Sequence, residues 1–192
     1  MKPLKLAYYR HHDVVSLSQD LLGKFLMTHI GGKVTGGMIV ETEAYQGPED
    51  RASHAFGGRR TRRNEVMYGQ GGICYVYRCY GIHNLFNIVT HSTNIPHAIL
   101  IRAIAPVDGI EVMLKRRGKE KVDKTLCGGP GTVSQALGIE LKHSGLPVTG
   151  PEIWVEDRGI KIAKKDIIAG PRVGVDYAGE HASLPWRFRV KV

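Results

Sequence analysis

The sequence predicts an α+β fold, built on a mostly antiparallel β-sheet with a few helices. The 24 glycines and nine prolines among 192 residues indicate many turns and short elements. The expected strands and helices do not alternate regularly, which favours an antiparallel sheet over a parallel one. Hydrophobic residues make up 42% of the chain, and no repeat, low-complexity tract or long linker interrupts it. Residues 1–192 are therefore expected to form one domain with one core.

The first expected element is a short helix over residues 13–23, with the sequence DVVSLSQDLLG. Asp13 or Ser16 can cap its first turn, because both side chains accept hydrogen bonds from free backbone N–H groups. Gly23 follows the expected end of the helix, where a left-handed conformation is common.

Strands are expected next. Residues 24–45 predict a hairpin whose turn is Gly31-Gly32. Residues 71–91 predict a second pair of strands, which breaks at Tyr80-Gly81, and residues 97–106 predict a further strand. The first half of the chain is therefore dominated by strands.

The second half mixes both types of element. A helix is expected over residues 108–118, where it ends in a basic cluster, and a shorter one over residues 129–138. Pro130 lies near the start of the shorter helix and Gly138 just after it, the positions that these residues favour. Late strands are expected over residues 152–157, 172–177 and 187–192.

The net charge of +9 predicts a partner that carries phosphate groups. Nucleic acid is the first choice and an anionic membrane surface the second, while a basic surface without such a partner is the alternative. The stretch VETEAYQGPEDRASH, residues 40–54, runs against this charge because it gathers Glu41, Glu43, Glu49 and Asp50. Carboxylates cost affinity for a polyanion, so their presence there needs a reason.

Strand periodicity places two of these carboxylates beside a tyrosine. Residues two apart share a face of a strand, so one face is expected to hold Ile39, Glu41, Glu43 and Tyr45. The other face, expected to be the core face, holds Met38, Val40, Thr42 and Ala44. Glu43 and Tyr45 are therefore expected to project together, although a solvated carboxylate paired with a lysine would produce the same pattern.

The next strands add exposed aromatic and basic residues. Tyr75 and Tyr77 share a face, and Tyr80 lies at the tip of the expected hairpin, where its ring could act as a wedge between stacked bases. The alternative is a ring that folds back over the sheet. Candidate phosphate contacts, which could equally be solvated surface, are Arg59, Arg60, Arg62, Arg63 and the cluster at residues 115–121.

Other features limit the compartment and the chemistry. Three cysteines without a CxxC pair favour a reducing compartment over a disulfide framework. The N-terminal residues lack an apolar signal segment and no run of eighteen apolar residues occurs, so a soluble, intracellular protein without a membrane partner is expected. The nine histidines, including His11-His12, show no HExxH or His/Cys spacing, so no metal is expected.

Several long motifs together resemble one known family. VETEAYQGPEDRASH, YVYRCYGIHNLFNIV, ILIRA, CGGPGTVSQALGI and RVGVDYAGEHASLPWRF are similar, in collinear order over nearly the whole chain, to the alkyladenine (3-methyladenine) DNA glycosylases. The chain resembles a compact bacterial-type member, without the N-terminal extension of mammalian members. The resemblance implies a single domain with a curved, open-barrel-like sheet, and a likeness to enzymes that need no cofactor.

The resemblance also implies roles for individual residues. Glu43 is similar to the general base of the family, Arg102 to an arginine beside the catalytic water, and Val173 to a residue whose backbone carbonyl holds that water. The base pocket is implied to consist of Tyr45, His54, Tyr77 and Asn87, and Tyr80 is similar to the tyrosine that fills the gap in the duplex. Asn87 matches an asparagine that disfavours guanine. Ile82-His83 departs from the mammalian Met-Tyr, which leaves the contact to the opposite strand open.

These expectations add up to a monofunctional DNA glycosylase of base excision repair. It would act as an intracellular monomer on double-stranded DNA with alkylated or deaminated purines, in the cytoplasm and, if the protein is bacterial, at the nucleoid. Such an enzyme must extrude its target base, and one carboxylate can then activate a water molecule, which would explain Glu43 in a basic groove. Two rivals remain: a nucleic-acid-binding module without activity, and a carbohydrate glycosidase that uses Glu41 and Glu43, which the arginine clusters disfavour.

Overall fold

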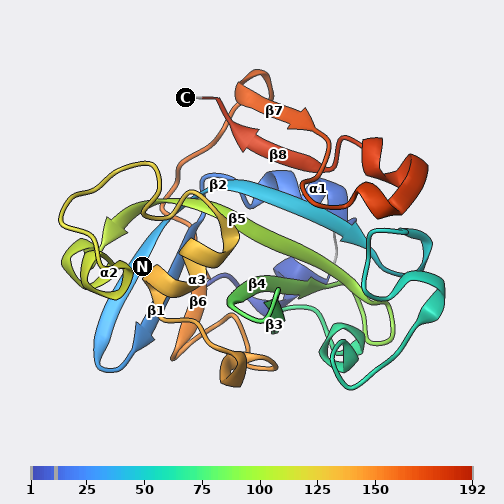
Figure 1. Cartoon of the computed structure of the whole chain (residues 1–192), viewed down its shortest axis with the longest axis horizontal. Helices are drawn as coiled ribbons and strands as arrows, with labels where there is room; N and C mark the ends of the chain where they lie inside the picture. The colour runs from blue at the N-terminus through green and yellow to red at the C-terminus, as the bar shows by residue number, and fades with distance from the viewer. Residues whose placement is uncertain (1, 11–12, 192) are drawn as a thin grey trace.

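The computed structural model describes residues 2–10 and 13–191; His11 and His12 lie outside the described residues. Figure 1 shows a long, curved sheet with helices packed against it, and irregular segments of the chain beyond the ends of the strands. This arrangement confirms the predicted α+β fold with a curved, mostly antiparallel sheet. No helix within these two ranges is long and apolar enough to cross a membrane.

The sheet contains eight strands within the described residues, and all of the pairs between them are antiparallel. The strands are β1 (Phe25–Ile30), β2 (Lys33–Gln46), β3 (Cys74–Cys79), β4 (His83–Thr90), β5 (His97–Asp108), β6 (Ile153–Glu156), β7 (Ile167–Gly170) and β8 (Arg187–Val190). Their order along the sheet is β3-β4-β5-β2-β1-β6, and β8 pairs with both β2 and β7. The long strands β2 and β5 therefore form the centre of the fold.

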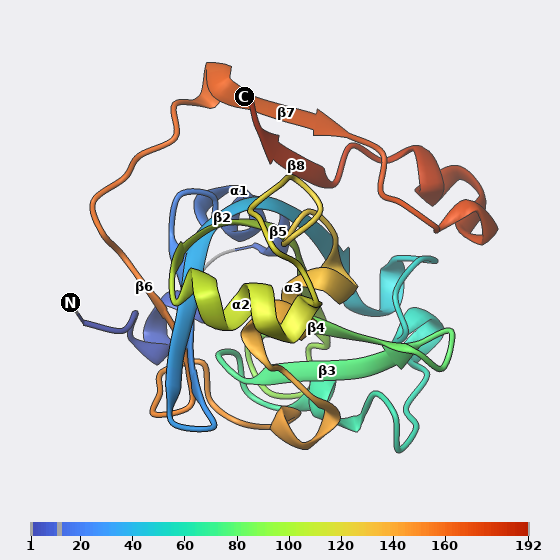
Figure 2. The same cartoon turned by 60° about the vertical axis from the view of Figure 1, so that its left-hand side comes forward.

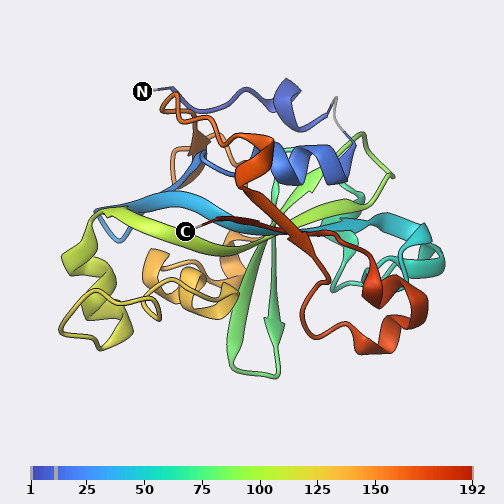
Figure 3. The same ribbon diagram turned by 90° about the horizontal axis from the view of Figure 1, so that it is seen from above.

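In the part of the chain that the structure describes, three α-helices cover the sheet: α1 (Val14–Asp20), α2 (Ile110–Arg117) and α3 (Pro130–Leu137). The helix α1 packs against β2 and β5, whereas α3 packs against β4 and β5. Figures 2 and 3 show that the β3–β4 hairpin extends from the sheet on the side that also carries α2 and α3. The segment that follows β7 lies near the same side, beyond the hairpin.

The ends of the helices follow the predicted chemistry. The carboxylate of Asp13 accepts hydrogen bonds from the backbone N–H groups of Val15 and Ser16, both at 3.0 Å, and so caps α1. Pro130 is the first residue of α3, and Gly138 follows its end with a φ of 75°, which side chains with a Cβ rarely adopt. The expected helices and the two hairpins are confirmed.

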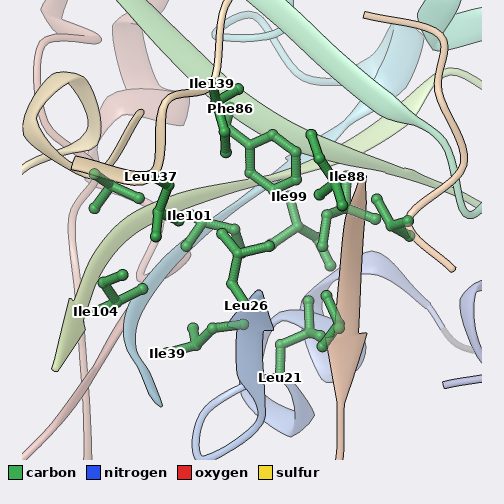
Figure 4. Packing of buried hydrophobic residues seen from close by; sticks show 14 of the residues in the cluster. Leu21, Leu26, Ile39, Phe86, Ile88, Ile99, Ile101, Ile104, Leu137 and Ile139 are labelled. Atoms are coloured by element: carbon green, nitrogen blue, oxygen red, sulfur yellow. The ribbon is translucent and has the colours of Figure 1, made fainter. Parts of the chain in front are cut away.

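The main core lies where the curved sheet meets α1 and α3. Its side chains come from alternate positions of each strand; for example, Ile88 on β4 lies directly opposite Ile99 on β5. Figure 4 labels part of this core: Leu21, Leu26, Ile39, Phe86, Ile88, Ile99, Ile101, Ile104, Leu137 and Ile139. Since the intervening residues of β4 and β5 point to the other face, Asn87 and Leu100 are available to line a site there.

The predicted division of β2 into two faces is only partly right. Ile39 is fully buried in the core, although simple alternation placed it beside Glu41 and Glu43. The cause is a pair of irregularities: the register shifts between Ile39 and Glu41, and shifts back between Glu41 and Thr42. The first leaves an extra residue on β2 and the second leaves Arg102 as the extra residue on β5. Thr42 and Ala44 keep the predicted core orientation, and Glu43 and Tyr45 remain neighbours.

The predicted strand over residues 172–177 is wrong. Residues 172–175 form an irregular loop, and a 3-10 segment (Asp176–Ser183) follows it. Arg172 is buried by its ion pair with Asp50 and not by a place in the sheet. The nearby strand β7 was not predicted, since its sequence IIAG is short and follows a lysine-rich turn.

Candidate active site

A cavity of about 760 Å³ opens between the β3–β4 hairpin, the start of α3 and the loop at residues 173–177. Among the residues that line it are many of those predicted from the sequence: Tyr45, His54, Arg63, Tyr77, Tyr80, Asn87, Arg102 and Val173. Segments far apart in the sequence thus meet at one hollow. Its volume falls in the usual range for small-molecule pockets, so it can hold a purine base.

Glu43 lies beneath this cavity, with a fully buried side chain. One carboxylate oxygen accepts a hydrogen bond from the Tyr45 hydroxyl at 2.8 Å, and the other accepts one from the backbone N–H of Val173 at 2.8 Å. Arg102 lies 3.4 Å from that second oxygen. All three neighbours line the cavity, whereas the solvated carboxylate that the sequence also allowed is excluded by this burial.

Arg102 connects Glu43 to a second carboxylate. Its Nε donates to Glu41 at 2.9 Å, and Arg187 on β8 donates to the same oxygen of Glu41 at 2.6 Å. The bulge on β5 turns Arg102 toward β2, so that one guanidinium touches both Glu41 and Glu43. Glu41 therefore orients arginines.

Tyr45 keeps its proton. Burial, and next the charge of Glu43, raise the pKa of its hydroxyl well above the ordinary value of 10.0. The hydroxyl is therefore a permanent donor to Glu43, while the side chain also lines the cavity. Val173 reaches Glu43 through its N–H group; the role of its carbonyl, implied by the resemblance, stays a prediction.

Three aromatic rings form one wall of the cavity. Nδ1 of His54 and the hydroxyl of Tyr75 are 2.7 Å apart, and the rings of His54 and Tyr77 meet edge to face with centroids 4.6 Å apart. Burial, together with Arg63 and Arg59, lowers the pKa of His54 from 6.5 to about 4. The imidazole is therefore neutral at pH 7 and presents a flat surface without a positive charge.

Asn87 is buried at the cavity wall on β4. Its Nδ2 donates to the backbone carbonyls of Tyr75, at 3.1 Å, and Leu85, at 3.3 Å. Two hydrogen bonds therefore fix the orientation of the carboxamide in the cavity wall.

Tyr80 projects into solvent at the tip of the hairpin, where it is 88% exposed. Its φ of 50° is unusual for a residue with a Cβ, and Gly81 follows with a φ of 72°. The ring therefore does not fold back over the sheet, which was the alternative. Ile82 beside it is also largely exposed.

The four predicted arginines lie in different environments. Arg60 pairs with Glu65 and lies over the ring of Tyr68, while Arg63 donates to the carbonyl of Arg78 and lines the cavity. Arg59 and Arg62 are exposed and form no ion pair with other described residues. Arg63 is exposed too and forms no ion pair with a described residue, so Arg59, Arg62 and Arg63 all keep the free charge expected of a phosphate contact.

Sequence reasoning did not find the pair Asp50–Arg172, whose side chains are both fully buried. Asp50 was included in the acidic motif, but its partner Arg172 was assigned to the expected strand over residues 172–177. It also gave no role to Tyr177, which is 71% exposed at the mouth of the cavity. The only feature of the sequence that could have indicated this position is that Tyr177 lies between two glycines, Gly174 and Gly179.

Within residues 2–10 and 13–191, no group of three or more His, Cys, Asp or Glu side chains could hold a metal ion. The chemistry that the site offers is that of one buried carboxylate, its three donors and a set of neutral aromatic rings.

A family model described as methylpurine-DNA glycosylase matches residues 7–192. The chain belongs to the methylpurine-DNA glycosylase family. It is accordingly a DNA repair enzyme, a hydrolase that acts on N-glycosyl bonds. The resemblance found in the sequence motifs is confirmed.

Individual relatives extend over the same range. A protein of Chlamydia felis is 48% identical over 187 residues, which cover 97% of this chain and 95% of the relative. A protein of Chlamydia pneumoniae is 46% identical over 182 residues, 94% of this chain and 91% of the relative. One of Bacillus licheniformis is 42% identical over 191 residues, 99% of this chain and 94% of the relative. Each bears the name "Putative 3-methyladenine DNA glycosylase". This member of the methylpurine-DNA glycosylase family is therefore similar to them along nearly its full length.

Proposed function

We propose that this glycosylase removes alkylated and deaminated purines from duplex DNA, of the 3-methyladenine, 7-methylguanine, hypoxanthine and ethenoadenine classes. It would rotate the damaged nucleotide out of the helix into the cavity and hydrolyse its N-glycosyl bond with a water molecule activated by Glu43. The observation that carries this proposal is Glu43 itself, a buried carboxylate beneath an aromatic cavity on a basic protein.

The base would enter between the rings of the cavity wall. Tyr45, His54 and Tyr77 offer flat surfaces on which a purine can stack, and none of them carries a positive charge at pH 7. A purine alkylated at N3 or N7 is cationic, so neutral aromatic faces attract it through their π-electrons. Outside, Tyr80 would occupy the space left in the duplex, where stacking offsets part of the cost of unpairing.

The bond cleavage needs only one base. The water oxygen attacks C1′ of the sugar as the bond from C1′ to the purine nitrogen breaks, and the electron pair of that bond leaves with the purine. Glu43 takes a proton from the water, and its negative charge stabilises the oxocarbenium-like sugar. The products are a free purine and an abasic sugar. A cationic purine leaves as a neutral molecule, so no second carboxylate is required for it. A neutral purine such as hypoxanthine leaves as an anion, which hydrogen bonds in the pocket would stabilise until it takes up a proton.

Arg102 and Val173 would support Glu43 in this step. The Val173 N–H and the Tyr45 hydroxyl donate hydrogen bonds to the carboxylate, and Arg102 pairs with it, so all three hold it in one orientation. Both residues line the cavity, from which the guanidinium of Arg102 and the carbonyl of Val173 could position the attacking water.

The contacts of Glu41 argue against the rival carbohydrate glycosidase. Such an enzyme would need a second carboxyl group that can give up a proton, yet Glu41 binds the guanidinium groups of Arg102 and Arg187. A neutral sugar would also gain nothing from the net charge of +9.

Product analysis on duplexes with single defined lesions tests the proposal. We expect a free purine and an alkali-labile abasic site from duplexes with 3-methyladenine, 7-methylguanine, hypoxanthine or ethenoadenine, and none from an undamaged duplex. Binding to the lesions without release of any base would reduce the protein to a binding module. Release of one class alone would restrict the proposed substrate range to that class.

A further inference from the structure

Arg172 is the most highly connected side chain near Glu43. Its guanidinium donates two hydrogen bonds to the carboxylate of Asp50, one of them at 2.8 Å, and one to the carbonyl of Ala44 at 2.8 Å. A further hydrogen bond reaches the carbonyl of His181 at 3.2 Å. The same group lies 4.8 Å from the ring centroid of Tyr45 and 5.2 Å from that of Trp186.

Asp50 anchors this guanidinium to the end of β2. Besides Arg172 it accepts hydrogen bonds from the backbone N–H groups of Gln46, at 3.3 Å, and Ala52, at 3.0 Å. A bidentate carboxylate–guanidinium pair has one favoured geometry, unlike a lysine–carboxylate pair. The loop at residues 172–175 is therefore fixed against β2 in a single position.

The two groups that donate hydrogen bonds to Glu43 both depend on this position. Val173, which donates its N–H to Glu43, directly follows Arg172 in the chain. Tyr45, which donates its hydroxyl, lies under the guanidinium, and Ala44 between Glu43 and Tyr45 is held by it. Only Arg102 reaches Glu43 from a different direction, from β5.

Stability alone is a weak reason for such a pair. Removing two charges from water costs several kcal/mol per ion, and well-packed apolar residues of similar volume often stabilise a protein as well or better. An apolar pair could not form the directional hydrogen bonds by which Arg172 links the loop at residues 172–175 to Asp50 and to the backbone carbonyl of Ala44.

We infer that Asp50 and Arg172 form a positioning pair for the reaction: they hold the N–H of Val173 and the hydroxyl of Tyr45 on Glu43. This inference rests on the proposed role of Glu43 as the base. Neither side chain touches the reacting atoms, so their effect passes through the geometry of Glu43.

Other charged and titratable groups surround Glu43 and must stay unchanged in a test. They are Glu41 and Tyr45 on β2, Arg102 on β5, Arg187 on β8, and His181, whose Nδ1 lies 3.8 Å from Asp50. Substitutions should therefore be confined to the pair itself.

The test uses Asp50→Asn, which keeps the shape of the side chain, and Arg172→Gln. The matched control is Arg158→Gln. Arg158 also binds two carboxylates, Glu156 at 2.7 Å and Asp108 at 2.6 Å, and also lies over an aromatic ring, that of Phe25. It follows β6, at the opposite end of the sheet order from β3, and does not line the cavity.

For each variant we would measure thermal stability, the Kd for a hypoxanthine duplex, and the single-turnover rate of excision from pH 5 to 9. The Asp50 and Arg172 variants should excise about ten- to a hundredfold more slowly, as expected for a displaced catalytic group, with a Kd within about threefold of wild type. Backbone amide exchange at Val173 should become faster in both. The control should lose stability alone.

Wild-type excision rates and unchanged amide exchange at Val173 in Asp50→Asn or Arg172→Gln would make the pair structural and overturn the inference. If Arg172→Gln does not fold, the rate and the Val173 exchange of the milder Asp50→Asn decide the question. Glu43→Gln, measured beside them, separates the two proposals: if it excises at the wild-type rate, the role of Glu43 fails. If it is inactive while the pair variants excise normally, only the positioning role fails.

Discussion

The lowered pKa of His54, in the wall of the cavity, predicts how the free energy of unfolding depends on pH. The pKa of His54 is lowered from 6.5 to about 4, chiefly by burial and next by Arg63 and Arg59. In the unfolded chain this imidazole takes up a proton near pH 6.5, whereas in the folded protein it resists protonation until about pH 4. Between these values the unfolded state binds more protons, so the free energy of unfolding must fall as the pH falls.

The size of this loss follows from the two pKa values. A difference of one unit corresponds to about 1.36 kcal/mol, so the full shift is worth about 3 kcal/mol, of which about 2 kcal/mol should be lost between pH 7 and pH 5. The contribution is fully present above pH 6.5. His97, whose pKa burial also lowers, acts in the same direction, so the effect of His54 must be isolated by substitution.

Urea unfolding at pH 7 and pH 5 measures it. His54→Gln keeps a polar side chain that does not titrate, and its loss of stability between the two pH values should be about 2 kcal/mol smaller than that of wild type. The control is His29→Gln, at an exposed position on β1, which should behave like wild type. Equal pH dependence in wild type and His54→Gln would refute a neutral, buried His54, and with it the uncharged wall proposed for cationic purines.

Three further predictions concern the interaction with DNA. Tyr80→Ala should weaken binding to a duplex with an abasic analogue, because stacking no longer offsets unpairing, which costs a few kcal/mol; unchanged binding would mean that the exposed ring does not enter the duplex. Charge reversal at Arg59 and Arg62 should reduce the slope of log K against log salt by about 0.9 for each phosphate group that is no longer bound, and an identical slope would leave both side chains in solvent. Asn87→Ser should raise the guanine-to-hypoxanthine ratio of single-turnover rates about ten- to a hundredfold, since clash with the 2-amino group and unpaired donors each cost about 1–3 kcal/mol. If that ratio stays at the wild-type value, Asn87 does not select against guanine.

Local patterns were sufficient to predict most of the fold. Glycine pairs, helix caps and strand periodicity depend on neighbouring residues, so α1, α3 and both hairpins could be predicted from the sequence. The bulges at Val40 and Arg102 could not, because a bulge depends on how two distant strands pair. As a result Ile39 was assigned to the wrong face, and the rotation of Arg102 toward Glu41 was not foreseen.

In the site, too, contacts between neighbouring residues could be predicted and contacts between distant residues could not. Glu43 and Tyr45 could be paired from the sequence because they lie two residues apart on one strand, and their hydrogen bond confirms that neighbourhood. Asp50 and Arg172 are 122 residues apart, and only the tertiary fold brings them together. The apparent strand over residues 172–177 has the same origin, because an arginine buried by a carboxylate mimics an inward-facing strand position.

Glu43→Gln tests most directly whether Glu43 acts as the base. The amide keeps the size of the side chain and can still pair with Tyr45 and Val173, so binding to a lesion duplex should be retained. Single-turnover excision of hypoxanthine should fall by at least about a hundredfold, the usual scale of general-base catalysis. Near-wild-type excision by a folded Glu43→Gln protein would contradict this role.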